Sequence, residues 1–423
     1  MDENAVAKAL TEARALVACL EDIQQRGEKS VESSKHLVLL EHVHKCRAAL
    51  EEPYDIGTRW LENMSEASAL FLLLRIGAFE RVPTERSIAA TSLASTCNVD
   101  VSVITRAMRI LVARGIFTET NDDEYKHSST SRAFAPEELG GFVCVSIGIM
   151  KSWIAMPDYV KTHKPDELFD PRKSPFAFAE GHEGKTYYEV LDLDPRERQL
   201  WNRTLQNMSK NFPVLGMFPF REMGDKVRAE PERPFIVDIG GGRGQALLQI
   251  RTECDGDGFG GRLVLQDLPL VIESLQPDDV PGVETMSHDI FTQQPIKSEF
   301  CRLSFGKGIQ VLTDRVKDAH IYYMRRLLHD FYDPKVIDIL RNTASAMGPS
   351  SRLVICDMLV PDRVQVGGPM TLYWLDFALM AIGGKERSLN DFRRVLSEAG
   401  LELANVYNAP GSNVANLETC LLR

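Results

Sequence analysis

Val237-Asp-Ile-Gly-Gly-Gly-Arg-Gly244 is the stretch that decides the fold of this chain of 423 residues. The apolar run Phe235–Ile239 predicts a buried strand, and the glycines predict a tight loop that opens a helix at about Gln245. Glycine lets the backbone approach a ligand closely, and the first N–H groups of a helix are free to bind one. The sequence therefore predicts a ligand site where this strand ends.

Short β-branched runs alternate with helical patterns from this stretch onward. Arg262–Gln266, His320–Met324 and Arg352–Cys356 are strand-like, and Pro334–Met347 between the last two is helical. Such alternation is typical of an α/β fold with a doubly wound, parallel, Rossmann-like sheet, which binds ligands at the carboxyl ends of its strands.

The spacing of the glycines distinguishes between cofactors. They stand at Gly240, Gly241, Gly242 and Gly244, whereas a dinucleotide fingerprint needs a further glycine where this chain has Gln245. No Walker lysine is present. Asp238 at the strand end would repel a diphosphate, but it suits a cofactor that ends in a cationic amino acid.

Two further acids follow in order along the chain. Asp267 ends the second strand, where a carboxylate can accept both ribose hydroxyls, and Asp289 lies close to the expected edge of an adenine. Three acids without a basic phosphate clamp indicate S-adenosylmethionine rather than NAD or ATP.

His329 follows the strand His320–Met324 and is the candidate general base. A histidine at this edge can take a proton near neutral pH, and methyl transfer to a phenol needs proton removal and alignment. Asp357 and Glu386 could flank His329 and stabilise its charged form. The alternative is a histidine bonded only for structural reasons, and Asp330 is expected to be a structural loop carboxylate.

The N-terminal half is mostly helical and contains a helix, turn, helix and wing pattern. Helices are expected at Thr84–Thr96 and Val101–Ala113, with strand-like pieces at Ile116–Glu119 and Tyr125–His127. Residues 81–132 hold seven basic and six acidic side chains, and the chain has a net charge of -11. This balance is a poor footprint for phosphate binding, so no nucleic-acid partner is expected.

Neither a membrane span nor a metal site is expected. The longest uninterrupted apolar stretch, Phe142–Met150, has nine residues, whereas a span needs about 20. The eight cysteines are scattered, and no histidine cluster accompanies them. A soluble, cytoplasmic protein is therefore expected. Its expected domains are 1–228, for dimerisation and the acceptor pocket, and 229–423, for the cofactor and catalysis, joined near Arg228–Pro234.

Taken together, the motifs resemble the plant-type and fungal O-methyltransferases, the caffeate/flavonoid group whose fungal members methylate polyketide and other phenolic metabolites. The resemblance covers nearly the whole chain. Besides the glycine loop, it rests on Phe212–Phe218, Gln266-Asp-Leu-Pro269, Leu328-His-Asp330 and Gly383-Gly-Lys-Glu-Arg387. It implies a Rossmann-like methyltransferase domain, preceded by a mostly helical winged-helix domain that forms a homodimer.

Residue by residue, the resemblance also implies roles in the site. It makes His329 the general base, with Asp357 and Glu386 as its flanking acids. Asp357 stands where plant relatives usually have the longer Glu, and Phe331 stands where relatives often have Trp. The implied cofactor contacts are Gly240, Gly241, Asp267, Asp289, Ile290 and Arg325, beside Asp238 and Gly242 from the loop itself.

The expected substrate is a phenolic or enolic hydroxyl of a small aromatic or polyketide-type metabolite. Some fungal relatives keep S-adenosylmethionine as a bound element and catalyse dehydration or pericyclic reactions without methylation. Retention of His329 and Glu386 favours methylation, because a relative that does not methylate has no need of that base. A ligand-responsive regulator is disfavoured by the charge count.

One segment departs from the family pattern. Residues 298–315 are extra, and their removal would leave a family-like join before the strand His320–Met324. The segment is either a surface loop or translated intron sequence, which transcript sequencing would distinguish.

Overall fold

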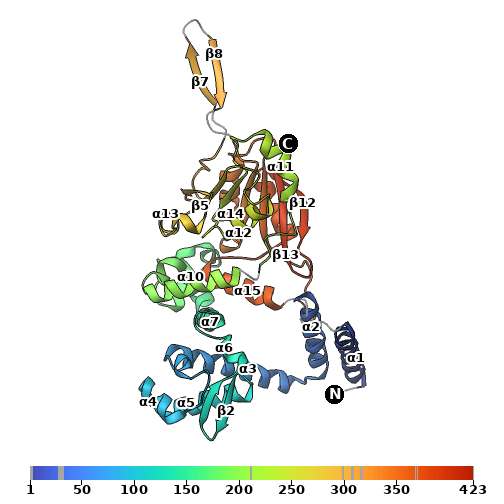
Figure 1. Ribbon diagram of the computed structural model, residues 1–423, viewed down its shortest axis with the longest axis vertical. Helices are drawn as coiled ribbons and strands as arrows, with labels where there is room; N and C mark the ends of the chain where they lie inside the picture. The colour runs from blue at the N-terminus through green and yellow to red at the C-terminus, as the bar shows by residue number, and fades with distance from the viewer. Residues whose placement is uncertain are drawn as a thin grey trace. The chain divides into compact units, whose positions relative to one another are not determined.

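The computed structural model describes residues 3–26, 33–209, 212–297, 300–305, 309–314, 318–366, 368 and 370–422 (Figure 1). The chain forms two compact units, Met1–Asn211 and Phe212–Arg423. The division therefore precedes the expected boundary at 228/229. Phe218, Phe220 and Val227 are buried in the core of the second unit, which is why this segment belongs to it.

Helices make up most of the first unit. Its first two helices, α1 (Glu3–Arg26) and α2 (Ser33–Leu50), pack on each other, and His42 Nδ1 lies 2.8 Å from Glu12 Oε2 between them. The other helical elements are α3 (Pro53–Arg75), η1 (Phe79–Arg81), α4 (Ala90–Cys97), α5 (Val101–Ala113), α6 (Ser129–Arg132), α7 (Leu139–Thr162), η2 (Pro165–Phe169), η3 (Pro171–Lys173), α8 (Pro175–Ala179), α9 (Tyr187–Leu191) and α10 (Pro195–Ser209).

Helices α4 and α5 lie beside a small antiparallel sheet in the order β1 (Ile88–Ala89), β3 (Glu124–His127), β2 (Phe117–Asn121). The predicted helix Val101–Ala113 is confirmed, and its apolar stripe of Ile104, Met108 and Leu111 is buried. The prediction of a helix from Thr84 was wrong. Ile88 pairs with Tyr125 of β3, so the helix begins only at Ala90.

By length and composition, helix α7 could cross a membrane, and among the described residues it is the one helix that meets this test. Core helices of soluble proteins meet the same test. Within the first unit α7 contacts α3, α8 and α10, and Pro157 lies inside it.

The second unit is built on an eight-stranded sheet. Along its main path the order is β12 (Leu401–Asn408), β13 (Val414–Leu421), β10 (Arg352–Val360), β9 (Ile321–Arg325), β4 (Ile236–Ile239), β5 (Leu263–Asp267), β6 (Glu284–Ser287). The five neighbouring strands β10, β9, β4, β5 and β6 are parallel. Strand β13 is antiparallel to β10, and β12 is antiparallel to β13. The short β11 (Arg387–Ser388) pairs with the end of β10. The predicted doubly wound, Rossmann-like sheet is confirmed.

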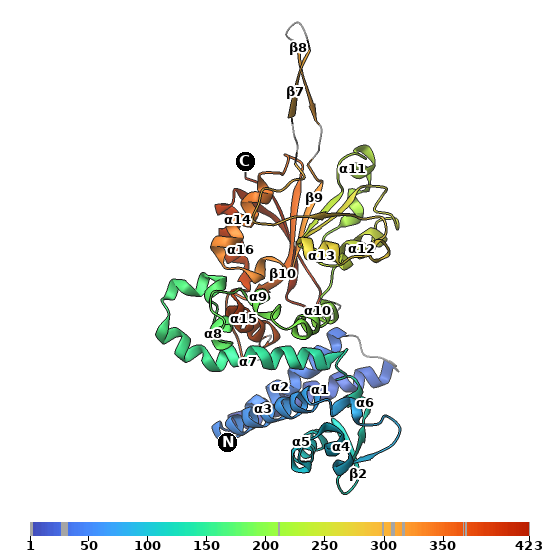
Figure 2. The ribbon, with the colours of Figure 1, turned by 90° about the vertical axis from the view of Figure 1, so that its left-hand side faces the viewer.

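Helices cover both faces of this sheet (Figure 2). On one face α14 (Asp333–Ala344) and α16 (Leu389–Glu398) pack on Val237 and Tyr322, and on the other α12 (Gln245–Glu253) packs on Ile236 and Tyr323. Consecutive strand residues point to opposite faces, so the continuous apolar runs contribute side chains to the hydrophobic cores on both faces of the sheet. The remaining helical elements are η4 (Phe220–Met223), α11 (Gly224–Ala229), α13 (Pro269–Glu273), η5 (Pro277–Asp279), η6 (Leu328–Asp330) and α15 (Met370–Ile382).

The chain changes direction between the two central strands. After β4 it builds outward through β5 and β6, and it then returns to place β9 on the other side of β4. The carboxyl ends of β4 and β9 therefore flank the switch point, where open α/β sheets bind their ligands.

The segment predicted to be extra forms a hairpin of β7 (Phe300–Phe305) and β8 (Ile309–Asp314). Residues 298–299, 306–308 and 315 of that prediction lie outside the described residues. The two strands pair with each other in a sheet of their own and project away from the eight-stranded sheet (Figure 2).

Removal of residues 298–315 is expected to leave the second unit folded, because among the described strands β7 and β8 pair only with each other. The deletion variant should keep the far-ultraviolet circular dichroism of the full chain and melt within a few degrees of it. A matched deletion of β6 (Glu284–Ser287), which pairs with β5 in the main sheet, should abolish cooperative unfolding. Aggregation of the 298–315 deletion alone would contradict a peripheral hairpin.

Candidate active site

The carboxyl edge of the parallel strands gathers the predicted acids. Asp238 lies in β4, Asp267 ends β5, and Asp357 lies in β10, while His329 lies in η6 directly after β9. Parallel pairing aligns the strand ends at one edge, which is why residues far apart in sequence meet there.

Asp238 is buried without a partner. Its side chain is 1% exposed, and neither carboxylate oxygen has a hydrogen-bond partner among the described residues. Burial raises its pKa to about 7. A buried carboxylate of this kind is stabilised by a cationic group of a ligand, which would restore its negative charge.

The glycine loop after β4 is shaped by close contacts. A Cβ at Gly241 would overlap with the Asp238 carboxylate, and Gly240, Gly242 and Gly244 have φ values of 69°, 60° and 76°. This left-handed region is open to glycine at little cost. The loop is tied to the next strand, because the Gly242 N–H donates to Asp267 Oδ2 at 2.8 Å.

Asp289 and Ile290 lie on the loop after β6. Asp289 is exposed and accepts a hydrogen bond from the Phe291 N–H at 3.0 Å, while the Ile290 carbonyl accepts one from Asn342 Nδ2 at 3.2 Å. Phe291 packs edge-to-face on Phe331, with the ring centroids 5.4 Å apart. The loop thus carries one acid beside an aromatic pair.

Arg325 ends β9 and anchors the start of the second unit. Its Nη2 donates to the Phe212 carbonyl at 2.9 Å. Its charge acts on Asp238, whose pKa it lowers against the larger effect of burial.

The Gly383–Arg387 segment holds the backbone of the turn that carries His329, through one backbone donor and one side-chain donor. The Lys385 N–H donates to the His329 carbonyl at 2.8 Å, and the buried Arg387 donates to the Leu328 carbonyl at 2.9 Å. Gly384 approaches so closely that a Cβ there would overlap with the His329 carbonyl. One five-residue motif thus fixes the turn that carries the histidine.

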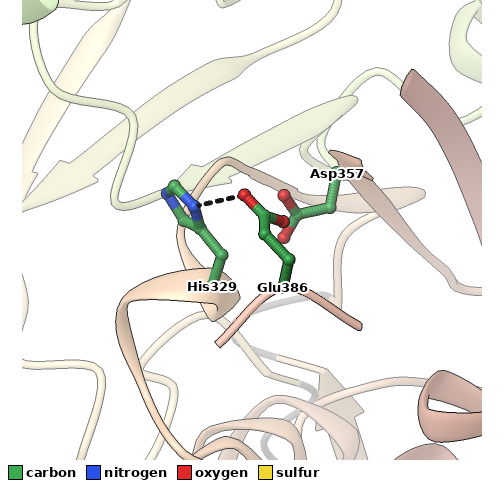
Figure 3. Close-up of side chains that lie close together, drawn as sticks. All are labelled: His329, Asp357 and Glu386. Atoms are coloured by element: carbon green, nitrogen blue, oxygen red, sulfur yellow. Dashed lines mark hydrogen bonds and ion pairs between the residues drawn. The ribbon is translucent and has the colours of Figure 1, made fainter. Parts of the chain in front are cut away.

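The side chain of Glu386, from the same motif, pairs with the histidine (Figure 3). Glu386 Oε1 lies 3.2 Å from His329 Nδ1, and Asp330 Oδ1 lies 3.4 Å from Nε2. The Glu386 N–H in turn donates to Asp376 Oδ1 of α15 at 2.8 Å. The contact at Nδ1 is a hydrogen bond, whereas the one at Nε2 is an ion-pair contact only. This difference favours the tautomer that keeps its proton at Nδ1 and leaves Nε2 to act as the base.

Asp357 makes a different contact from the one implied by the sequence. Within the described residues its hydrogen bonds are with Arg326 Nη1 at 2.7 Å and the Met358 N–H at 3.1 Å, and none is with His329. The shorter Asp side chain stops at the guanidinium, which also donates to Glu386 Oε1 at 2.9 Å. Asp357 therefore acts on the histidine through its charge and through Arg326, not through a hydrogen bond.

The protonation behaviour of His329 follows from these neighbours. Burial and the charge of Arg326 lower the pKa of His329, but the carboxylates of Asp330 and Glu386 outweigh them, so the pKa lies above its usual value. The pKa of Glu386 falls to about 2, since Arg326 and His329 together outweigh the effect of burial. Glu386 thus stays ionised and can stabilise an imidazolium.

His329, Asp357 and Glu386 could by geometry hold a metal ion, because their ligand atoms lie within 4.8 Å of one another. The Arg326 guanidinium, however, already lies between the two carboxylates and supplies a positive charge there. A metal ion would have to displace it.

The residues that act through others are not evident from the sequence pattern. Arg326 was not distinguished from its neighbour Arg325, although the doubled arginine after a strand was a visible signal. Gly384 and Arg387 were quoted within a motif without a role. Asp376 carries no signal in sequence, because it reaches Glu386 only through the packing of α15.

Comparisons with known proteins define the class. The O-methyltransferase domain family matches residues 153–402. An O-methyltransferase of Hypomyces subiculosus, hmp5, is 38% identical over 95% of this chain and 98% of its own length. The chain belongs to the O-methyltransferase family.

Solved structures show the same fold. OxaC in complex with SAH and oxaline is 25% identical, with a TM-score of 0.79 over 99% of this chain and 100% of its own. LepI in complex with SAM is 23% identical, with a TM-score of 0.77 over 97% and 100%. The family uses S-adenosylmethionine as its cofactor.

The residues at the sheet edge fit this cofactor. The orphaned Asp238 carboxylate suits a cationic amino acid, and at Gly242 a Cβ would enter space that no described protein atom fills within 4 Å. Asp267 ends β5, where nucleotide-binding sheets place an acid for the ribose.

Replacement of Gly384 by Ala should destabilise the turn that carries His329, because the added Cβ would overlap with the His329 carbonyl. We expect a loss of about 1–3 kcal/mol in the free energy of unfolding, measured in urea. Gly57→Ala in α3 is the control, since its Cβ would meet nothing within 4 Å. An unchanged stability of the Gly384 variant would contradict the close approach.

Proposed function

We propose that the protein transfers the methyl group of S-adenosylmethionine to a phenolic or enolic hydroxyl of a small aromatic or polyketide-type secondary metabolite. The observation that carries the proposal is the hydrogen bond between His329 and Glu386 at the carboxyl edge of the sheet, in a chain that belongs to the O-methyltransferase family. We take a hydroxyl as the methyl acceptor because its oxygen must lose a proton when it is methylated, and a base beside the methyl donor can remove that proton.

The cofactor site uses the acids and the glycine loop. Asp238 binds the amino-acid end, Asp267 binds the ribose, and Asp289 lies on the adenine side. Gly240, Gly241 and Gly242 let the backbone approach, and Ile290 and Arg325 complete the contacts. When bound, S-adenosylmethionine supplies a methyl group already activated by the positive sulfur.

His329 takes the proton from the acceptor at Nε2. A phenol has a pKa of about 10, so removal of its proton near neutral pH needs a base that is held in place. Glu386 accepts a hydrogen bond from the Nδ1–H of His329 and, while it stays ionised, stabilises the imidazolium that forms. Asp357 has an indirect role in proton removal, because its carboxylate accepts a hydrogen bond from Arg326 and holds that side chain in place.

A second candidate function is a reaction without methyl transfer, in which the cofactor stays bound as an electrostatic element. The fold is compatible with it, since LepI and a protein described as a pericyclic reaction enzyme share the architecture at 23% identity. The paired His329 and Glu386 support methylation over a purely pericyclic reaction, which needs no base; a dehydration would also use one, so label transfer distinguishes these two.

Incubation with methyl-labelled S-adenosylmethionine and a panel of phenols and enols should transfer label to at least one acceptor. His329→Ala should lower kcat by about 10²–10⁴-fold, whereas His182→Ala, at an exposed site, should leave it unchanged. The activity should fall as the pH drops through the raised pKa of His329, because the protonated imidazole cannot act as a base.

Tight binding of the cofactor without label transfer to any acceptor would contradict methylation. Conversion of an acceptor without incorporation of label would favour the second candidate. Full activity of His329→Ala would remove the histidine from the mechanism while leaving methyl transfer intact.

We also propose that the protein is a cytoplasmic homodimer, with a winged-helix N-terminal half that serves dimerisation and neither nucleic-acid nor membrane binding. Helices α1 to α3 expose many large apolar side chains, an unusual amount for a monomer's surface. They are Val6, Leu10, Val17, Leu20, Leu37, Val38, Leu40, Val43, Leu50, Tyr54, Trp60, Leu61, Met64 and Leu72.

Light scattering should give twice the chain mass of 47.4 kDa for the wild type. Trp60→Glu combined with Leu61→Glu should give monomers, because two charges would enter the apolar interface. Val366→Glu, at an exposed position of the second unit, is the control and should stay dimeric. A monomeric wild type would overturn the proposal.

A further inference from the structure

Arg326 occupies a costly backbone position. It follows β9 directly and has a φ of 49°, in the left-handed region that non-glycine residues rarely adopt. Its N–H donates to the Cys356 carbonyl of β10 at 3.0 Å, which fixes the turn. Such conformations persist where the surroundings enforce them, and they cluster at functional sites.

The guanidinium of Arg326 is held on two sides. Nη1 donates to Asp357 Oδ1 at 2.7 Å and to Glu386 Oε1 at 2.9 Å, and the side chain is 13% exposed. The ring of Phe212 covers the guanidinium, with its centroid 4.9 Å from Arg326 Cζ. Phe212 is itself tied through its carbonyl to Arg325.

Arg326 and His329 contact the same carboxylate oxygen. Glu386 Oε1 lies 2.9 Å from Arg326 Nη1 and 3.2 Å from His329 Nδ1. An arginine keeps its charge at all working pH values, whereas the histidine gains and loses one. The permanent charge therefore limits how strongly Glu386 can stabilise the imidazolium.

The charged groups around His329 come from every element packed against it. Asp330 lies beside it in η6, Glu386 lies on the loop before β11, and Asp357 and Arg326 lie at β10 and the end of β9. Asp376 of α15 faces the site through the Glu386 N–H. Arg326 is the cation that offsets these carboxylates at the centre of the cluster.

We propose that Arg326 is a positioning residue that holds Asp357 and Glu386 ionised and limits the negative charge at His329, so that the imidazole returns to its neutral, basic form between turnovers. This inference rests on the proposed function, and it says which residue sets the proton affinity of the same base, His329. Without the guanidinium, two buried carboxylates would lie side by side, and either a carboxyl or the histidine would retain a proton.

The test compares variants that differ only in the charge at position 326. Burial raises the pKa of Asp357, so that carboxyl would take up a proton if Arg326 were removed alone. The Asp357→Asn variant removes this buffer and serves as the reference. The double variant Arg326→Met/Asp357→Asn removes both charges of the ion pair, so neither position keeps a buried charge without its partner. Exchange of a buried ion pair for uncharged groups is often neutral for stability.

Titration of carbon-13-labelled histidine by NMR, with the His329 signal identified by its loss in His329→Ala, measures the effect directly. The His329 midpoint should lie about one pH unit or more higher in Arg326→Met/Asp357→Asn than in Asp357→Asn. Arg326→Lys/Asp357→Asn, which retains a positive charge, should bring the midpoint most of the way back to that of Asp357→Asn. The low-pH limb of kcat/KM should move in the same direction.

Equal His329 midpoints in Asp357→Asn and Arg326→Met/Asp357→Asn would overturn the proposal. A merely structural arginine would change the melting temperature without moving the midpoint. Because the titration uses neither cofactor nor acceptor, it stands if methyl transfer is never observed. Conversely, an active enzyme with an unmoved midpoint would refute only the role of Arg326.

Discussion

Two carboxylates buried side by side, those of Asp357 and Glu386, are the constraint on which this site depends. Each loses hydration on burial, and neither can stay ionised beside the other without a cation. Arg326 supplies that cation through a single nitrogen that contacts both. The strained turn after β9, the aromatic cover by Phe212 and the approach of the Gly383–Arg387 segment all serve to place these three groups together.

The histidine depends on the same arrangement. Glu386 contacts His329 through its side chain, while its neighbours Lys385 and Arg387 bind the backbone of the turn that carries the histidine. Position and proton affinity of the base thus come from one short segment. The cofactor side is separate, because Asp238 and the glycine loop are built on β4 and β5, on the other side of the switch point.

Several parts of the molecule were predictable because they depend on local patterns. The glycine spacing, the acid after each strand and the alternation of strand and helix gave the sheet and the family, and the helix Val101–Ala113 had the predicted bounds. The helix expected from Thr84 failed because Ile88 pairs with a strand more than thirty residues away. The boundary near Arg228 failed because burial on the sheet, rather than proline and charge, decides where a unit begins.

The sequence by itself determined the class of protein and the types of residue at the sheet edge, since motif spacing and strand periodicity are properties of the chain. Only the tertiary structure decided that Asp357 pairs with Arg326 instead of His329, and that Gly384 presses on the His329 carbonyl. These contacts join β9, β10 and the loop before β11, and their geometry depends on side-chain lengths and backbone angles at three separate places. A local sequence pattern does not specify which side chain a buried charged group will contact in the folded protein.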